Sequence, residues 1–233
     1  MNLSSISFFR SRRRESKQFA VIGLGRFGRA VCATLYGMGY EVMGVDRCEK
    51  CVDKAANDEI ATHVLELDST DPLALKQAGI FEFDTVIVAI GNYIEESVIT
   101  TLNLKEKGVD YVVAKASSKI HEKLLKKVGA DLVLFPEDEM GCELARYLTQ
   151  PSILERFELD PDYSIVEVLV PREFEGKTLA EIQLRNNYGL NLIALSENDK
   201  LEINTTGFQR LRKGAKMVII GANKDIKRLP IYG

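Results

Sequence analysis

The chain has 233 residues and a formal net charge of −3, and 45% of its residues are hydrophobic and 28% charged. These values are ordinary for a soluble globular protein and argue against a nucleic-acid binder. No apolar run approaches the roughly 20 residues that a membrane span needs, and we expect no secretory signal because the N-terminus lacks an apolar segment. Four cysteines in such a chain suggest reduced thiols in the cytosol.

Residues 1–17 form a basic segment that differs from the rest of the chain. Five arginines and lysines against one glutamate give it a net charge of +4, and serines lie between them. This composition predicts a flexible solvated arm. Contact with anionic lipid or with an acidic partner surface is the alternative.

The segment from Phe19 to Asp46, FAVIGLGRFGRAVCATLYGMGYEVMGVD, reads as strand, glycine turn, helix and strand. Gly23, Gly25 and Gly28 have the G-x-G-x-x-G spacing, and an acid follows about 20 residues later, as in dinucleotide-binding units. The first glycine permits the tight turn, the second lets the backbone approach a phosphate, and the third lets the helix pack closely. The helix N-terminus attracts phosphate. Asp46 would accept hydrogen bonds from ribose hydroxyls and repel a 2′-phosphate.

Strands and helices continue to alternate after Asp46. We expect helices at 52–60, 72–78, 94–107, 119–128 and 139–147, and strands at 63–67, 85–90, 111–114 and 132–135. The strand at 85–90 is almost wholly apolar, as expected of a central parallel strand that is buried on both faces. Six strands alternating with helices predict a Rossmann-type, doubly wound parallel sheet over residues 18–135.

The remainder of the chain has a different pattern. Residues 136–160 are expected to hold a crossover helix and a linker, with a shift in composition at 149–152. Beyond them we expect a small α+β domain over residues 161–233, with strands at 164–170, 190–195 and 217–220 and a short helix at 179–185.

Ligand-binding side chains should gather at the carboxyl ends of the parallel strands. The candidates for cofactor binding are Gly23, Gly25, Arg26, Phe27, Gly28, Asp46, Arg47, Asp68, Ser69, Ile90, Gly91 and Lys115. Two of these roles stay open. Asp68 could reach adenine or ribose, or it could cap the helix after Thr70. Lys115 could face phosphate, or it could extend along the surface towards water.

Arg26 is unusual because a cation in the first turn of a helix opposes the helix dipole, by roughly 0.3–1 kcal/mol. Its presence is easier to explain if a polyanion binds there. Backbone N–H groups already serve a pyrophosphate, so the arginine favours a ligand with a further phosphate, such as ATP. Arg29 and Arg47 could assist it, or they could be solvated surface residues.

The sequence favours a nucleotide receptor over an enzyme. A dehydrogenase would need a proton donor or base beside the nicotinamide. His63 begins a strand at the end remote from the crevice, and we expect His121 to lie on an exposed helix. Cys48-x-x-Cys51 most simply starts the helix after the second strand, and half a zinc site or a redox pair is the alternative.

The ordered motifs FAVIGLGRFG, EVMGVD, DTVIVAIG, YVVAKA, HEKLLKKVGADLVLFPEDEMG and YSIVEVLVP resemble the cytosolic RCK (KTN/TrkA-like) regulatory subunits of Ktr-type potassium uptake systems. The segments GKTLAEIQLRNNYGLNLIAL and DIKRLP resemble the family's C-terminal RCK domain. This resemblance implies homodimers that assemble into an octameric ring beneath a membrane-embedded potassium-translocating subunit. It also implies that ATP activates and ADP inactivates, with NAD(H) bound in relatives.

The resemblance also implies individual roles. Arg26 is similar to the arginine that reaches the γ-phosphate across the dimer, and Asp46 matches the ribose acid. Glu137, in PEDEMG, resembles a carboxylate that helps hold a cation, Mg²⁺ or Ca²⁺, near that phosphate. By itself this residue is an acid at a helix start, which capping and the dipole would explain. The competing functions are a small NAD-dependent oxidoreductase and a stand-alone NADH sensor.

A second ligand is expected only from the resemblance. Some relatives bind cyclic di-AMP at the C-terminal dimer interface, through the segment that corresponds to Leu184, Arg185 and Asn186. The loop after Leu201 reads EINTTGFQRL and lacks the proline expected there. This departure weighs against cyclic di-AMP.

Overall fold

The computed structural model describes residues 17–149, 151–198, 200–203 and 205–231. The basic arm therefore lies outside the described residues, apart from Lys17. The chain divides into two compact units, with the boundary between Asp138 and Glu139. Among the described residues, no helix combines the length and the apolar character that crossing a membrane requires.

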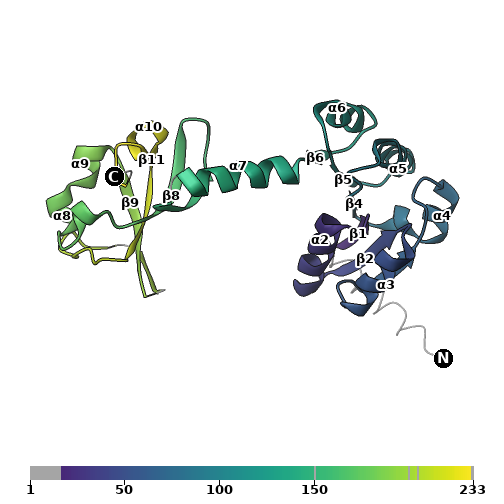
Figure 1. Cartoon of the computed structure of the whole chain (residues 1–233), viewed down its shortest axis with the longest axis horizontal. Coiled ribbons are helices and arrows are strands. Elements are labelled where there is room, and N and C mark those ends of the chain that lie inside the picture. Colours follow the sequence, from purple (N-terminus) through teal and green to yellow (C-terminus); the bar gives the residue numbers. More distant parts are fainter. Residues whose placement is uncertain (1–16, 150, 199, 204, 232–233) are drawn as a thin grey trace, which may run out of the picture. The chain divides into compact units, whose positions relative to one another are not determined.

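The first unit contains a six-stranded parallel sheet with helices between its strands (Figure 1). Its elements are β1 (Gln18–Ile22), α2 (Arg26–Gly37), β2 (Glu41–Asp46), α3 (Glu49–Asn57), β3 (His63–Glu66), α4 (Pro72–Gln77), η1 (Ile80–Glu82), β4 (Thr85–Val88), α5 (Ile94–Glu106), β5 (Tyr111–Lys115), α6 (Lys119–Lys127) and β6 (Leu132–Leu134). The strand order is β3-β2-β1-β4-β5-β6. This order confirms the predicted doubly wound Rossmann-type fold.

The central strands are buried on both faces, which explains their apolar sequences. Ala20 and Ile22 of β1 belong to one core cluster, and Val21 belongs to the cluster on the other face. Strand β1 pairs with β2 on one side and with β4 on the other. The chain adds β2 and β3 on one side of β1 and then crosses to add β4 on the other side. A ligand crevice is expected at such a switch in strand order, at the carboxyl ends of β1 and β4.

Helix α7 (Pro136–Thr149) begins in the first unit and continues past the boundary between the units. Pro136 is its first residue, where the missing N–H costs nothing. The helix is longer than the predicted 139–147. None of its residues is buried in the described chain.

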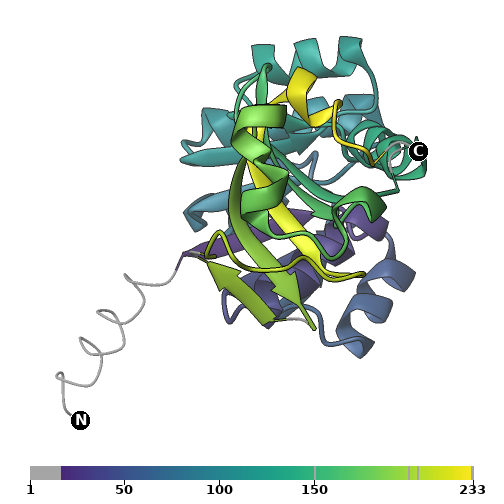
Figure 2. The same ribbon diagram turned by 90° about the vertical axis from the view of Figure 1, so that its left-hand side faces the viewer.

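The second unit is built on a five-stranded antiparallel sheet, in which β9 and β11 run side by side (Figure 2). Its elements are β7 (Ile153–Glu158), β8 (Tyr163–Leu169), η2 (Arg172–Phe174), α8 (Leu179–Ile182), α9 (Leu184–Tyr188), β9 (Asn191–Glu197), β10 (Lys200–Ile203), β11 (Lys216–Ala222) and α10 (Asn223–Ile226), and the strand order is β10-β9-β11-β8-β7. A separate small α+β domain is therefore confirmed.

Two details of this unit differ from expectation. The stretch expected to hold only a crossover helix and a linker, 136–160, contains strand β7, which pairs with β8. The helix expected at 179–185 is two short helices, because Gln183 between them has a left-handed backbone with φ of 48°. A residue in that conformation interrupts the helical hydrogen-bond ladder.

Candidate functional site

A cavity of about 300 Å³ lies at the carboxyl ends of the parallel strands. Its lining includes every residue predicted to bind the cofactor except Gly28, and it also includes Glu137: Ile22, Gly23, Gly25, Arg26, Phe27, Asp46, Arg47, Leu67, Asp68, Ser69, Ala89, Ile90, Gly91, Asn92, Tyr93, Glu96, Lys115 and Glu137. Its volume is at the lower end of the usual range for small-molecule sites.

The glycine turn between β1 and α2 shapes one side of the cavity. Gly23 has φ of 104°, and its N–H donates to Val45 O at 2.7 Å. A Cβ on Gly28 would lie 1.8 Å from Gly23 O, so only glycine lets the helix approach the strand. Apart from its chain neighbours and the backbone of its own helix, no heavy atom of the described chain lies within 4 Å of the place where a Cβ on Gly25 would be. The Gly25 backbone therefore faces open space.

The Asp46 carboxylate is held in place by two backbone groups. Its Oδ2 accepts from the Leu24 N–H at 2.6 Å, and its Oδ1 accepts from the Cys48 N–H at 2.9 Å. These bonds join the end of β2 to the glycine turn and to the start of α3. A carboxylate offers about four acceptor positions, so two remain for hydroxyl donors from a ligand.

Two cations line the cavity, Arg26 from the start of α2 and Lys115 from the end of β5. Arg26 is the first residue of α2, beside the free N–H groups of the helix start. The Lys115 side chain is 13% exposed; its Nζ forms an ion pair with Glu137 Oε1 and lies 5.8 Å from the centre of the Phe27 ring. Lys115 therefore points along the cavity wall and does not extend into water.

Glu137 lies in the first turn of α7. Its hydrogen bond from Lys115 holds the pKa of this carboxyl below its usual value. Among the described residues, no group of three or more histidine, cysteine or acidic side chains is arranged to hold a metal ion. A cation at Glu137 would therefore need oxygen ligands from a bound molecule as well.

Arg47 also lines the cavity. Its guanidinium forms an ion pair with Glu96 and lies 4.4 Å from the centre of the Tyr93 ring. The sequence-based prediction missed Tyr93 and Glu96. The signal was their position just after Gly91, at the N-cap and in the first turn of α5. Arg29 instead pairs with Asp58, and it is absent from the cavity lining.

The Asp68 carboxylate forms hydrogen bonds with Thr70, two residues later. Its Oδ1 accepts from both the hydroxyl and the N–H of Thr70, and these hydrogen bonds lower the pKa of the carboxyl. The cap of α4 is Asp71, which accepts from Leu73 N–H at 2.8 Å. Asp68 thus closes the preceding turn while it lines the cavity. Ser69 is nearly buried and bonds to Thr100, which indicates a structural role for its hydroxyl.

The expected exposure of His121 is wrong. Its side chain is completely buried, its Nδ1 lies 3.3 Å from the Ser117 N–H, and its Nε2 has no hydrogen-bond partner within the described chain. Burial lowers the pKa of this imidazole. His63 is exposed at the start of β3, and neither histidine lines the cavity.

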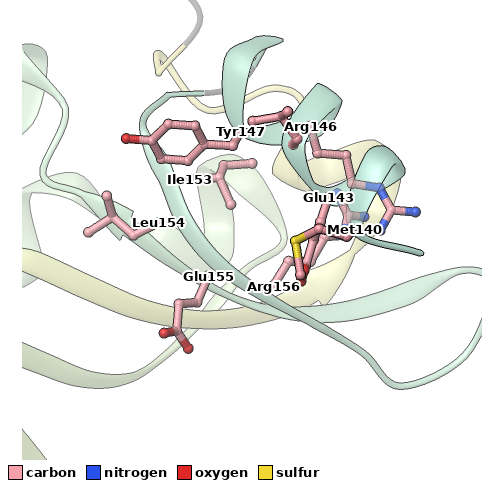
Figure 3. Close-up of a pocket in the computed structure, with 9 residues that line it drawn as sticks. Met140, Glu143, Arg146, Tyr147, Ile153, Leu154, Glu155 and Arg156 are labelled. Carbon is pink, nitrogen blue, oxygen red and sulfur yellow. The ribbon is translucent and has the colours of Figure 1, made fainter. Parts of the chain in front are cut away.

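A second cavity, of about 510 Å³, lies in the second unit between α7 and β7 (Figure 3). Its lining includes the apolar side chains Met140, Leu144, Tyr147 and Ile153. The first three are 56–64% exposed in the described chain. The lining also includes the charged residues Glu143, Arg146, Glu155 and Arg156, so this apolar groove has a charged rim.

Comparisons with known proteins agree with the fold. A model of the TrkA-N domain matches residues 19–136, and a model of the TrkA-C domain matches residues 164–229. The crystal structure of the GsuK RCK domain is similar, with a TM-score of 0.54 and 26% identity. That alignment covers 91% of this chain, which spans only 45% of the GsuK chain.

Two bacterial proteins are similar over nearly their whole length. Ktr system potassium uptake protein C of Bacillus subtilis (strain 168) is 39% identical over 212 residues, 91% of this chain and 95% of that protein. Ktr system potassium uptake protein A of the same organism is 39% identical over 221 residues, 95% of this chain and 99% of that protein. Their names are those of potassium uptake proteins and not of enzymes, in accord with the prediction that the chain is not an enzyme. The chain therefore belongs to the TrkA-N/TrkA-C family of Ktr-type potassium uptake proteins.

Proposed function

We propose that the chain is a nucleotide-sensing regulatory subunit that controls a membrane potassium transporter, with ATP activating and ADP inactivating transport. The observation that carries this proposal is the cavity at the end of β1 and β4, which is lined by an acid, Asp46, and by two cations, Arg26 and Lys115. The acid suits a ribose and the cations suit phosphates. The potassium uptake named for both Bacillus relatives supports the transport role.

The choice of ATP over NAD(H) rests on charge. The helix start at Arg26 already offers backbone N–H groups to a diphosphate. Arg26 and Lys115 add two positive charges at this end of the cavity, which suits a third phosphate. ATP and ADP differ in that phosphate, so the two cations would distinguish them.

Glu137 offers a route from the nucleotide to helix α7. In the described chain it is neutralised by Lys115. We infer that a bound triphosphate competes for Lys115 and leaves Glu137 free to hold Mg²⁺ or Ca²⁺ together with phosphate oxygens, which are the ligands such cations prefer. Because α7 continues into the second unit, a change at Glu137 would act on the helix that joins the units.

The expected partners are a second copy of the chain, an octameric ring of such dimers, and a membrane-embedded potassium-translocating subunit. The apolar groove between α7 and β7 supports contact with another protein surface, since exposed apolar patches mark such sites. Through that transporter subunit the chain would be cytoplasmic and peripheral to the cell membrane. Cyclic di-AMP stays a weaker proposal for the C-terminal domain.

Titration of the purified chain with ATP, ADP, NADH and NADPH tests the nucleotide assignment. ATP and ADP should bind more tightly than the nicotinamide nucleotides. Arg26→Ala should weaken ATP binding roughly ten-fold or more, because a charge-assisted hydrogen bond contributes about 1.5–3 kcal/mol. ADP binding should change less.

Arg29→Ala is the matched control, because it removes the same charge one turn later in α2, where the side chain pairs with Asp58. Its nucleotide affinities should stay close to those of the unmodified chain. Tighter binding of NADH than ATP, together with no effect of Arg26→Ala, would contradict the assignment. Turnover of a nicotinamide substrate would instead favour the oxidoreductase.

A further inference from the structure

Two cysteines lie next to each other at the start of α3, close to the nucleotide cavity. Cys48 is exposed and is the N-cap residue of the helix, and Cys51 is half-buried one turn later. The Cys51 N–H donates to Cys48 O at 2.8 Å, which places both side chains in the same helical turn. Residues three apart in a helix have Cβ atoms about 5–6 Å apart, within reach of a small backbone adjustment for a disulfide.

The two thiols of the pair differ in their exposure and in their surroundings. A hydrogen bond with the Cys48 side chain, burial and the nearby Asp46 carboxylate raise the pKa of the Cys51 thiol to about 11. Cys51 is therefore the protonated, donating partner. Cys48 is exposed at the N-cap of α3, where a small oxidant can reach its sulfur atom.

The pair is joined directly to the cavity. The Cys48 N–H is one of the two backbone donors that hold the Asp46 carboxylate. Arg47, between these two residues, also lines the cavity. A movement of the Cys48 backbone would therefore change the position of the acid that is proposed to bind ribose.

We propose that Cys48 and Cys51 form a reversible disulfide that weakens nucleotide binding in the adjoining cavity. The oxidant is a low-molecular-weight disulfide. The Cys48 thiolate attacks one of its sulfur atoms, forms a mixed disulfide and releases one thiol. Cys51 then loses its proton to solvent and attacks the Cys48 sulfur, and the second thiol leaves. The pair loses two electrons and two protons, and the small disulfide is reduced to two thiols.

The effect on affinity rests on the proposed nucleotide function. Closing the disulfide draws the Cys48 and Cys51 sulfur atoms to about 2.05 Å. The first turn of α3 tightens, and the Cys48 N–H is displaced from Asp46. We expect ATP binding to weaken about five-fold or more, the lower end of typical coupling between two sites.

Thiol mapping of the full-length chain tests the covalent step. The chain is incubated with oxidised glutathione, its remaining thiols are alkylated, and its peptides are identified by mass spectrometry. Cys48 and Cys51 should be linked, and dithiothreitol should reverse the link. Buried Cys32 should stay a thiol, and exposed Cys142 should carry a glutathione adduct.

Variants separate the roles of the two thiols. Cys51→Ser should leave a glutathione adduct on Cys48, because nothing displaces it. Cys142→Ser should behave like the unmodified chain. Separate adducts on Cys48 and Cys51 in the unmodified chain, or tight zinc binding by the reduced pair that blocks oxidation, would overturn the proposal.

ATP titrations of the reduced and oxidised chain test the coupling. The affinity should fall on oxidation of the unmodified chain and stay constant on oxidation of Cys48→Ser. Equal affinities of the reduced and the disulfide-linked chain would overturn the coupling and leave the proposed function intact. If the reduced chain binds none of the four nucleotides, the proposed function and the coupling both fail.

Discussion

Gly28 is the residue whose replacement should disturb the site most simply. An added methyl group would fall 1.8 Å from the Gly23 carbonyl oxygen, so α2 would have to move away from β1. We expect Gly28→Ala to lower the free energy of unfolding by about 1–3 kcal/mol, as overpacking does. Urea denaturation would measure this loss.

Gly37→Ala is the control for that substitution. Gly37 is the last residue of the same helix, and a Cβ there would meet no heavy atom of the described chain within 4 Å, its neighbours and own helix aside. Replacing glycine by alanine within a helix also stabilises the helix by roughly 0.5–1 kcal/mol. Equal stabilities of the two variants would show that the close approach at Gly28 is unimportant.

The buried His121 predicts a pH dependence of stability. Burial depresses the pKa of its imidazole in the folded chain below the usual 6.5. The unfolded chain then binds more protons than the folded one as the pH falls below 6.5. The contribution of the neutral imidazole to the free energy of unfolding should therefore be fully present above pH 6.5. Below this pH the free energy of unfolding should decrease, by at most about 1.4 kcal/mol per pH unit.

Urea midpoints between pH 5 and pH 8 would measure this dependence. His121→Gln should flatten the change near pH 6, because glutamine does not titrate. His63→Gln is the control, since His63 is exposed on β3. An unchanged pH profile in His121→Gln would contradict the assignment of the titration to this imidazole.

The site was predictable where a residue type has a fixed position in a known motif. The glycines and Asp46 were found because their spacing follows the βαβ unit. Tyr93 and Glu96 were missed because their approach to Arg47 depends on how α5 is oriented against the sheet. His121 was misjudged because lysines dominate its short helix, although it shares the buried face with Leu125, four residues on.

At the scale of single elements, α8 depends on its cap. The Thr178 side chain accepts from Glu181 N–H at 3.2 Å, and the Glu181 side chain accepts from Thr178 N–H at 2.7 Å. This reciprocal pair is a capping box. Thr178→Ala should lower the free energy of unfolding by about 1 kcal/mol, and Thr178→Ser should restore most of it. Equal losses in both variants would contradict the capping role.

Helix α7 predicts a cation effect through its first turn. Glu137→Gln should strengthen ATP binding without divalent cations, because Lys115 is then free to pair with a phosphate. It should also remove any further strengthening by Mg²⁺ or Ca²⁺. Glu139 is exposed and lies two residues further along the same helix, so Glu139→Gln should keep that strengthening. Titrations with and without the cation would measure both. Retained strengthening in Glu137→Gln would exclude this carboxylate as the ligand.

Helices and strands with a clear pattern of apolar residues were predictable from the sequence. Elements that form only because they pair with another part of the fold were not. The central strands β1 and β4 of the parallel sheet are nearly continuous apolar runs, so their positions along the chain follow from the sequence. Strand β10 is exposed along its whole length and forms because it pairs with β9. The helix break at Gln183 could not be predicted because the residue is not a glycine. It is visible only in the structure, where Gln183 has a left-handed backbone conformation.

At the scale of the whole molecule, two units of different architecture are joined through α7. The first unit carries the polar cavity that suits a nucleotide, and the second carries the apolar groove that suits a protein surface. This division of roles matches a subunit that senses a small molecule and acts on a partner. We propose that nucleotide binding in the first unit controls potassium transport.

Potassium uptake tests this claim most directly. A transport-deficient host would carry a Ktr-type membrane subunit alone, with this chain, or with its Arg26→Ala or Arg29→Ala variant. We predict faster uptake with the unmodified chain and with Arg29→Ala than with the membrane subunit alone, and a loss of that gain with Arg26→Ala. Equal uptake with and without the chain would contradict regulation, and full activity of Arg26→Ala would contradict control through the nucleotide cavity.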